Sequence, residues 1–325
     1  MKPRFSVGEE VETCGNPLFD FEAADPHLLF WEGRFYIYAT KAAKTEAGFA
    51  VWSSQDLKKW RFDGMALQFA NVSWAQNDDW APAILERNGR FYLYFCADSQ
   101  IGVAVSDSPT GPFHDALGAP LLPFRDDISA IDPCAFTDDD GQSYLFFGAV
   151  PAFWLDPTQV KISTSLSVQK LGADLISLEG QEFPTVEYEP FGGIKNDFGA
   201  GRGHCLDHIE ASMVFKRRGV YYLMFSRGNH GMGSDERAYR VRYATAQNPL
   251  GPWQIAPEVV LQTRREIGCV GPGHHGVLEL PGDRWLVCYH AHGGDGFRRL
   301  WMDWMHFDDA GRILEIVPTR EGASL

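Results

Sequence analysis

Residues Leu206 to Phe225, LDHIEASMVFKRRGVYYLMF, contain two apolar, aromatic-rich runs separated by a turn at Arg218-Gly219. Such runs on either side of a glycine turn predict a β-hairpin. The first run carries a carboxylate, Glu210, among apolar and small residues. A single glutamate in a strand usually faces solvent, because burying an unpartnered carboxylate is costly. The hairpin recurs along the chain, however, and the recurrence gives Glu210 a different interpretation.

The same glycine turn and following strand occur five times. The turn glycines are Gly33, Gly89, Gly141, Gly219 and Gly282. A further strand and a turn with Ser, Asp, Pro or Gly follow most copies, as in 51–60, 103–113, 241–253 and, more weakly, 161–167. Units of roughly 40–50 residues with four strands each are typical of a β-propeller. We therefore predict an all-β, five-bladed β-propeller; a β-sandwich is the alternative, but it leaves the fivefold repeat unexplained.

The repeat predicts one catalytic domain over residues 1–325, without amphipathic helices between the units. The five blades are expected at roughly 16–75, 76–127, 128–203, 204–268 and 269–318. The longest interval between turn glycines contains an additional segment at 171–203, which is rich in Glu, Asp and Gly. Such a segment is either a functional loop at the rim of a pocket or a plain surface loop.

Composition and charge narrow the classes of function. The 325 residues are 45% hydrophobic and 14% aromatic, which is typical of a globular protein rich in strand formers. The net charge of −14 argues against nucleic acid or an anionic membrane surface as partner, since both need a basic patch.

No apolar run reaches the ~18–20 residues of a membrane span. The N-terminus has no apolar signal-peptide region, and the six cysteines form no C-x-x-C pair. We expect a cytoplasmic enzyme with a neutral ligand, although a secreted protein with its leader removed would look the same.

Chemically distinctive residues stand eight or nine positions before the turn glycines. The innermost strand of a propeller blade lines the central channel, so one equivalent position per blade is expected to face the axis. An isolated Asp-Pro pair often marks a turn. Three carboxylates at one axis repel one another, which function explains more readily than stability. The residues in this phase are Asp25, Trp80, Asp132, Glu210 and His274.

This set fits glycoside hydrolysis. That reaction needs a protonated acid for the leaving oxygen and an ionised carboxylate near the anomeric carbon. A third carboxylate can raise the pKa of the acid by like-charge repulsion. Trp80 offers a flat apolar face to a sugar ring. The chain has no G-x-S-x-G elbow, H-E-x-x-H or Walker loop, so other enzyme classes fit less well.

Five segments, in order, resemble those of glycoside hydrolase family 43. They are Ala-Asp25-Pro, Trp80-Ala-Pro, Ile-Asp132-Pro, Ile-Glu210-Ala-Ser and Gly-His274-His275, followed by FRRLWMDWMHFDDAGR at 297–312. The resemblance spans about residues 16–318. It implies a five-bladed propeller with an inverting mechanism. In that mechanism Asp25 is the general base, Glu210 is the general acid, and Asp132 tunes the pKa of the acid and positions it.

The resemblance also implies contacts with substrate and metal. Arg298 or Arg299 would reach the sugar from the fifth blade. His274 would bind a calcium ion mainly through water ligands, with His275 as the alternative. A channel histidine bonded to water is the structural alternative, since the chain has no EF-hand-like loop. We interpret the other histidines near the site segments as ordinary strand or rim residues; they are His204, His208, His290 and His292.

The family resemblance, and not the residue pattern, implies the sugar. We expect an exo-acting β-xylosidase, an α-L-arabinofuranosidase, or both, acting on xylo- or arabino-oligosaccharides without an organic cofactor. An endo-arabinanase of the same family is one alternative, and a non-catalytic sugar-binding propeller is another. A retaining fructan-active propeller is less favoured, because its Asn-Asp-Pro-Asn-like start and its Arg-Asp-Pro are absent. The sequence does not decide the oligomeric state.

Overall fold

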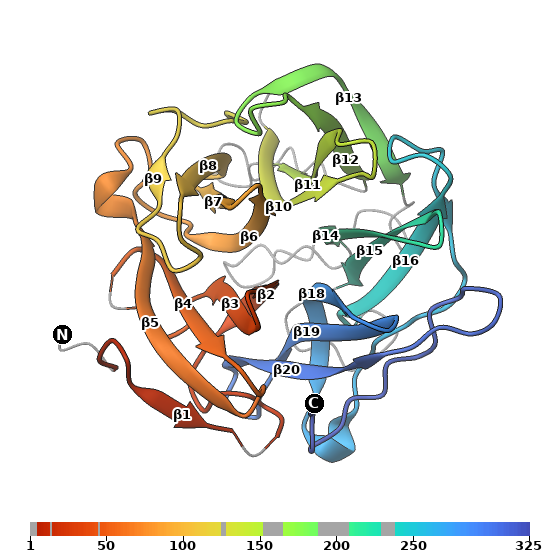
Figure 1. Ribbon diagram of the computed structural model, residues 1–325. Helices are drawn as coiled ribbons and strands as arrows, with labels where there is room; N and C mark the ends of the chain where they lie inside the picture. Colours follow the sequence, from red (N-terminus) through yellow and green to blue (C-terminus); the bar gives the residue numbers. More distant parts are fainter. Residues whose placement is uncertain are drawn as a thin grey trace, which may run out of the picture.

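The computed structural model describes residues 5–13, 15–44, 46–124, 128–151, 165–187, 208–228 and 238–325. These residues form five antiparallel sheets arranged around a central axis (Figure 1). The prediction of an all-β, five-bladed β-propeller is therefore confirmed. The helices of the described residues are two short 3-10 turns, η1 (Phe69–Asn71) and η2 (Arg265–Ile267). Within these same ranges, no helix is long and apolar enough to cross a membrane.

Each blade starts with a strand at the axis and continues outward through antiparallel neighbours. The innermost strands are β2 (Ala24–Trp31), β6 (Trp80–Arg87), β10 (Ile128–Thr137), β14 (His208–Arg217) and β18 (Val270–Leu280). The second strands are β3 (Arg34–Thr40), β7 (Arg90–Ala97), β11 (Ser143–Pro151), β15 (Val220–Gly228) and β19 (Arg284–His292). The third strands are β4 (Gly48–Ser54), β8 (Gln100–Ser106), β12 (Ser165–Leu171), β16 (Arg240–Ala246) and β20 (Arg298–Met305).

The outer edges differ between blades. Blades one to four have a fourth strand, and the fifth blade has three strands among the described residues. The fourth strands are β5 (Lys59–Gln68), β9 (His114–Asp115), β13 (Leu178–Glu187) and β17 (Gln254–Ile255). A short strand β1 (Glu10–Glu12) pairs with β5, so the first sheet begins ahead of the expected blade start at residue 16. The additional segment at 171–203 contributes β13, and its residues 188–203 lie outside the described ranges.

Turn chemistry fixes the register of the inner hairpins. The hairpin of β14 and β15 has a two-residue turn, Arg218-Gly219, in which both residues have positive φ, 51° and 81°. Two successive residues with positive φ match the right-handed twist of the flanking strands, and glycine adopts this conformation without steric cost. The other four turn glycines of the repeat also have positive φ, between 77° and 86°. A glycine therefore recurs in each repeat because the turn at that position needs a positive φ.

Hydrophobic side chains fill the space between neighbouring blades. Between the first and second blades, Tyr38, Val51, Leu93 and Phe95 are fully buried. Further clusters join the second blade to the third, the third to the fourth and fifth, and the fifth to the first. Full burial of one such side chain contributes roughly 1.5–3 kcal/mol. The apolar core thus lies between the sheets, which frees the starts of the innermost strands at the axis for polar residues.

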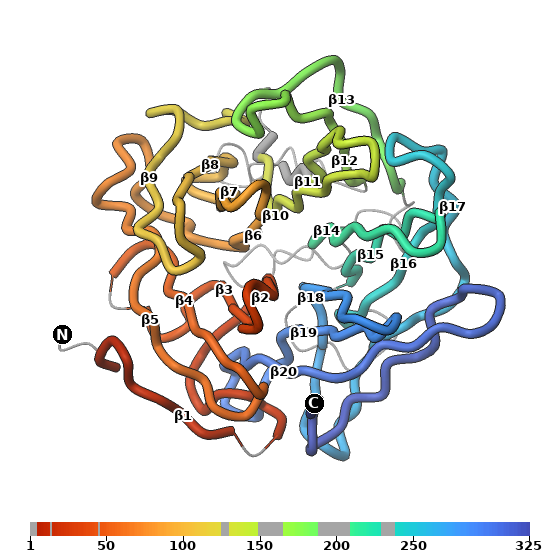
Figure 2. The backbone as a smooth tube through the Cα atoms, in the orientation of Figure 1, coloured from red at the N-terminus to blue at the C-terminus, as the bar shows by residue number. Residues whose placement is uncertain are grey.

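The segment ahead of β2, residues 15–23, lies along the fifth blade. The chain runs from the first blade at the left of Figure 2 round to the fifth at the bottom, where the C-terminus lies. The N-terminal segment lies beside β20: the Leu18 N–H donates to the Leu300 carbonyl at 2.7 Å. Asn16 bonds both ways to Met302, with Nδ2 donating to the carbonyl at 3.1 Å and Oδ1 accepting from the N–H at 2.8 Å. This pairing closes the ring of blades.

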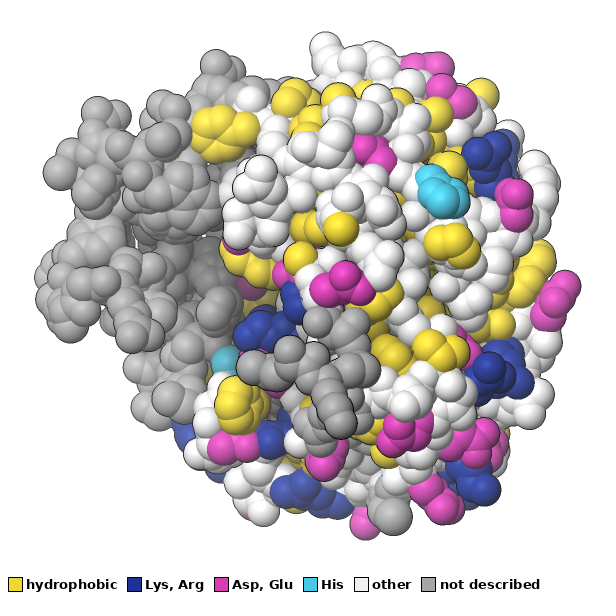
Figure 3. Space-filling view, turned by 90° about the vertical axis from the view of Figure 1, so that its left-hand side faces the viewer, with side chains coloured by type: hydrophobic (Ala, Val, Ile, Leu, Met, Phe, Trp, Pro, Cys, Tyr) yellow, Lys and Arg dark blue, Asp and Glu magenta, His cyan; other side chains and the backbone are white. Residues whose placement is uncertain are grey.

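Charged side chains of both signs are interspersed on the outer face seen in Figure 3, which is the left side of Figure 1. Among the described residues drawn there, no large patch of one sign is visible, and hydrophobic side chains are scattered between the charged ones.

Candidate active site

Every innermost strand carries a β-bulge near its start. At each bulge one non-glycine residue adopts a left-handed backbone conformation. Such residues are uncommon, and each costs on the order of 1–3 kcal/mol unless its surroundings hold it in place. Bulges are frequent next to active sites, because they redirect a side chain. The five residues are Asp25 (φ 52°), Ala81 (47°), Asp132 (55°), Ala211 (62°) and His274 (40°).

The prediction of one equivalent position per blade is wrong for two blades. In the second and fourth blades the bulge residue is an alanine, and Trp80 and Glu210 each stand one residue before it. The count from the turn glycine is misleading because the turns differ in length. Five residues separate the paired Thr137 and Ser143 in the third blade, whereas the fourth blade has a two-residue turn.

Three groups converge on one carboxylate oxygen of Asp25, which is 6% exposed. Its Oδ1 lies 3.1 Å from Arg298 Nη1, 3.0 Å from His290 Nδ1 and 3.3 Å from His274 Nδ1. Burial alone would raise the pKa of Asp25, but Arg298, His274 and His290 outweigh burial and hold this pKa well below its ordinary value. Asp25 is therefore ionised near neutral pH, as an acceptor of a proton from water must be.

Asp132, also 6% exposed, has different neighbours. Its Oδ2 accepts the Ala211 N–H at 3.1 Å and lies 3.7 Å from His274 Nδ1. Burial raises the pKa of Asp132 to about 7; Glu210 and Asp25 act in the same direction, against His274 and the Ala211 N–H. Because Asp132 and Glu210 repel each other when both are ionised, the pair retains a proton near neutral pH. The arrangement can supply both a proton donor and an ionised acceptor.

Glu210 is held by a residue that the sequence did not identify. The Tyr239 hydroxyl donates to Glu210 Oε1 at 2.6 Å. Tyr239 lies just before β16 and is fully buried. It stands outside the repeat pattern of innermost strands, so no sequence signal marks it.

The two arginines at the start of β20 point to different partners. Arg298 reaches Asp25, whereas Arg299 forms two hydrogen bonds with Asp295, at 2.9 and 2.5 Å. Adjacent residues of a strand face opposite sides, which explains the separation. The structure thus brings Arg298 to Asp25, and Arg299 to Asp295.

Trp80 lies at the start of β6 with 38% of its surface exposed. It is paired with Cys96, whose Sγ accepts the Asp132 N–H at 3.1 Å. An exposed tryptophan beside the bulges offers an apolar face at the rim of the carboxylate cluster.

Four bulges are held by a side chain from the second strand of the preceding blade, with the fifth blade preceding the first. Thr40, Cys96, Ser226 and His290 accept the N–H of Ala81, Asp132, His274 and Asp25, respectively. The equivalent position of the fifth blade is His290, which the sequence interpretation treated as an ordinary residue. These side chains stand seven or eight residues after each turn glycine, so reading downstream of the glycine would have found them. The third blade has Gly148 there, and Asp132 itself accepts the Ala211 N–H instead.

The predicted calcium site has no direct set of ligands. Within the described ranges, no group of three or more His, Cys, Asp or Glu side chains is arranged to hold a metal ion. His274 faces Asp25 and Asp132. The alternative, His275, is buried, and neither of its ring nitrogens has a hydrogen-bond partner in the protein. Burial lowers the pKa of His275 to about 3, so its ring is neutral and has an acceptor nitrogen for a water molecule.

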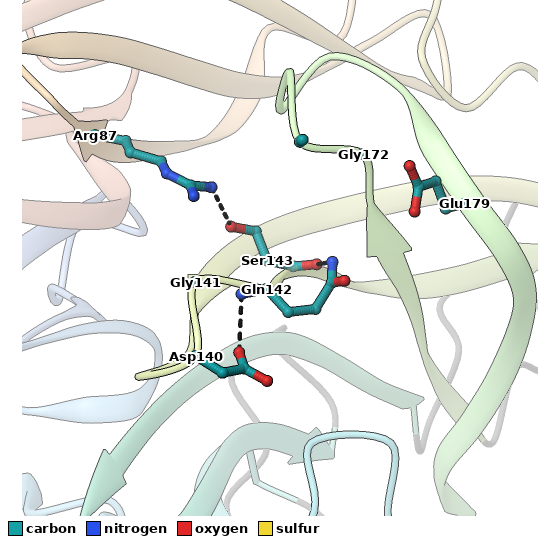
Figure 4. Close-up of a pocket in the computed structure, with 8 residues that line it drawn as sticks. Arg87, Asp140, Gly141, Gln142, Ser143, Gly172 and Glu179 are labelled. Atoms are coloured by element: carbon teal, nitrogen blue, oxygen red, sulfur yellow. Dashed lines mark hydrogen bonds between the residues drawn. The ribbon is translucent and has the colours of Figure 1, made fainter.

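A separate pocket of about 380 Å³ lies between the turn of the second blade and the third blade. Figure 4 shows the Arg87 side chain pointing toward Ser143 from one side, with Glu179 on the other. The Gly141 turn lines this pocket and lies at the opposite end of β10 from Asp132. It is therefore distinct from the carboxylate cluster, and its lining residues include no aromatic ring to stack on a sugar.

Comparison with known proteins identifies the family to which this chain belongs. The chain is 31% identical over 330 residues to a β-D-galactofuranosidase, XynD, from Aspergillus niger, covering 95% of this chain and 86% of that protein. It is 28% identical to an arabinoxylan arabinofuranohydrolase from Paenibacillus polymyxa, covering 93% of this chain and 51% of the relative. Other relatives have names of xylosidases and arabinanases. The solved structure of a thermostable family-43 glycoside hydrolase matches with a TM-score of 0.77 and 31% identity, covering 95% of this chain and 97% of that one. Since a family model described as glycosyl hydrolases family 43 matches residues 14–312, the chain belongs to that family.

Proposed function

We propose that this family member is an exo-acting, inverting glycosidase that releases arabinofuranose or xylose from the ends of hemicellulose-derived oligosaccharides. One observation carries the proposal. An aspartate held ionised and a carboxyl pair that retains a proton face the same axis, Asp25 on one side and Asp132 with Glu210 on the other. These are the two protonation states that glycoside hydrolysis requires together.

The proposed reaction transfers two protons. Glu210 protonates the glycosidic oxygen as the bond to the anomeric carbon breaks. A water molecule attacks that carbon from the opposite face and passes its proton to Asp25, which inverts the anomeric configuration. Asp132 repels a charge on Glu210, so that the two carboxyls together retain one proton near neutral pH. Inversion requires ~6.5–9.5 Å between acid and base carboxyls. The position of β18 between β2 and β14 favours such a gap, because acid and base then come from blades that are not neighbours (Figure 1).

Two further residues would contact the sugar. Trp80 would stack on a ring at the rim, since its indole is partly exposed. Arg298 would hydrogen-bond the sugar bound next to Asp25, because its guanidinium already lies at that carboxylate.

The names of the relatives support a furanose more than a pyranose. The two relatives described above act, by name, on galactofuranosides and on arabinofuranosyl groups of arabinoxylan. Xylose stays in the proposal because other relatives are named xylosidases.

The test is a panel of p-nitrophenyl glycosides. We expect the highest kcat/KM on the α-L-arabinofuranoside or the β-D-xylopyranoside. Proton NMR of the first product should show the inverted anomer, and retention would overturn the mechanism. Linear arabinan separates exo from endo action: an exo-acting enzyme releases monosaccharide from the start, whereas an endo-arabinanase first releases oligosaccharides.

A β-D-galactofuranoside belongs in the same panel, because a relative of that name is 31% identical to this chain. The β-D-galactofuranose ring has the same configuration at its ring carbons as α-L-arabinofuranose and adds one exocyclic carbon. A higher kcat/KM on the galactofuranoside than on the arabinofuranoside would make galactofuranose the preferred sugar and would leave the roles of the carboxylates unchanged.

We also propose that a calcium ion binds on the axis through water ligands, with His275 rather than His274 accepting a hydrogen bond from one of them. The buried, neutral and unpartnered ring of His275 supports this choice. Calcium prefers oxygen ligands, which water supplies. Chelation should lower the melting temperature and added calcium should restore it. An unchanged melting temperature after exhaustive EDTA treatment would contradict the proposal.

A further inference from the structure

The strongest unassigned contact in the site is the hydrogen bond from Tyr239 to Glu210. At 2.6 Å it is at the short end of the range for O–H···O hydrogen bonds. Two titratable groups lie beside this bond: Asp132 of β10, which acts on the pKa of Tyr239, and His290 of β19, whose ring stacks on Tyr239. His274 of β18 and Asp25 of β2 in turn act on the pKa of Asp132. Tyr239 itself is fully buried, and burial, with the charge of Glu210, raises its pKa well above the ordinary value. The phenol is therefore protonated and able to donate at any working pH.

The ring of Tyr239 is held in place from two sides. It stacks on the imidazole of His290, with centroids 5.9 Å apart and planes 5° from parallel. Gly273 of β18 leaves room on another side, because a Cβ at that position would overlap the Tyr239 ring. His290 in turn lies 3.0 Å from Asp25 Oδ1. A continuous chain of contacts thus joins Glu210 to Asp25 through two buried rings.

We infer that Tyr239 is a positioning residue for Glu210, which holds Oε1 as an acceptor and so directs the transferable proton to Oε2. This inference rests on the proposed role of Glu210 as general acid. The same bond has a second consequence. When the glycosidic oxygen takes the proton, Glu210 becomes a carboxylate, and a hydrogen bond to an ionised acceptor is stronger than one to a neutral acceptor. Tyr239 then stabilises charge that develops as the bond to the leaving group breaks.

The variant Tyr239→Phe tests this, because it removes the hydroxyl and keeps the ring that stacks on His290. For an oligosaccharide, whose leaving group needs a proton, we expect kcat/KM to fall about tenfold, since a hydrogen bond to a charged group is lost. For a 2,4-dinitrophenyl glycoside of the same sugar, which needs no proton, the change should stay within about twofold. The alkaline limb of the pH profile of kcat/KM should move up by about one unit, because the carboxylate of Glu210 loses a donor.

Tyr222→Phe is the matched control. Its hydroxyl donates to the Gly311 carbonyl at 2.7 Å, so that variant also loses one buried phenol hydrogen bond, far from the axis. It should lower the melting temperature without changing the leaving-group dependence or the alkaline limb. Tyr239→Phe could instead behave like this control, or lower kcat/KM equally for both substrates without moving the alkaline limb of the pH profile. In either case Tyr239 is only structural and the inference is wrong.

Glu210→Gln separates this inference from the proposed function. If that variant hydrolyses oligosaccharides as well as the wild type, the role of Glu210 as acid fails. If Glu210→Gln is impaired as expected, adding Tyr239→Phe should cause no further loss on oligosaccharides, because the acid that Tyr239 serves is already absent. An additional tenfold loss in the double variant would show that Tyr239 acts elsewhere.

Discussion

The first and third blades each place an aspartate on the same bulge, with φ of 52° and 55° and equal burial, and yet the two carboxyls have opposite charge preferences. Asp25 faces the fifth blade, where Arg298 and two imidazoles surround one oxygen. Asp132 faces the fourth blade, where it meets another carboxylate and a backbone N–H. The comparison shows that the neighbouring blade, and not the local backbone, sets the protonation state.

The residue opposite each bulge is part of this difference. Next to Asp25 stands His290, which burial keeps neutral by lowering its pKa to about 3. Its Nδ1 accepts the Asp25 N–H at 3.3 Å and lies 3.0 Å from Asp25 Oδ1. At the equivalent position of the third blade stands Gly148, which has no side chain to offer. Asp132 therefore serves as the acceptor for the bulge of the fourth blade.

Replacement of the ionised aspartate, Asp25, should have the largest effect on kcat/KM. In Asp25→Asn the attacking water loses its base, so we expect kcat/KM to fall by roughly 10²–10⁴-fold whatever the leaving group. Sugar binding should persist, which isothermal titration with the free monosaccharide measures. Activity within tenfold of the wild type would exclude Asp25 as the base, and loss of binding as well as activity would indicate a distorted site.

Asp132→Asn should lower kcat by about 10²-fold and at the same time stabilise the fold at alkaline pH. The folded pKa of Asp132 is raised to about 7, so the stabilisation it provides is present below its unfolded value and is lost as the pH rises through 7. Asparagine is neutral throughout. The melting temperature of the variant relative to the wild type should therefore increase from pH 5 to pH 8, by roughly 2 °C or more.

Asp25→Asn should change stability in the opposite sense. The folded pKa of Asp25 is lowered, so its contribution is present above the unfolded value and is lost only as the pH falls through the lowered one. At pH 8 this variant should melt below the wild type, since Arg298 keeps a charge without its partner. If both variants shifted the melting temperature in the same direction at pH 8, the contrast between the two aspartates would not hold.

Substitution of Arg298 should have a moderate effect on kcat/KM, and its neighbour Arg299 provides the matched control. Arg298→Ala removes the main charge that lowers the pKa of Asp25, so the acid limb of the pH profile should move up by about one unit. We expect kcat/KM to fall about 10-fold or more at neutral pH. Arg299→Ala loses a partly exposed pair with Asp295 and should leave the limb in place and kcat/KM within about twofold. Equal effects of the two substitutions would contradict the assignment of Arg298 to the site.

The smallest effect is expected from substitution of Gly148, whose missing side chain leaves Asp132 as the acceptor of the Ala211 N–H. A Cβ there would meet Ile131 Cγ1 at 3.5 Å, an ordinary contact, so both Gly148→Ser and Gly148→Ala should fold. A serine hydroxyl can take the Ala211 N–H from Asp132, which raises the pKa of Asp132 by up to about one unit. The loss of stability with rising pH, which ends near pH 7 in the wild type, should then continue to higher pH in the serine variant. Gly148→Ala, which has no hydroxyl, should match the wild type.

Much of the fold was predictable because its signals are local. A glycine with positive φ at each inner turn, followed by an aromatic strand, repeats in the sequence and marks every blade. The exact phase was not predictable, because the turn of the third blade is longer than the two-residue turn of the fourth, and a bulge in each strand shifts the count. As a result, the sequence placed Glu210 near the axis but on the wrong equivalent position.

The sequence by itself determined the propeller and brought Asp25, Asp132, Glu210 and His274 to one axis, since strand alternation and turn conformation depend on neighbouring residues in the chain. Only the tertiary structure decided which carboxyl is ionised, which arginine faces it, and that Tyr239 contacts Glu210. A pKa depends on burial and on charges within about 4–6 Å, whatever their distance in sequence. At this axis those charges come from other blades, and their identity is decided when the ring closes.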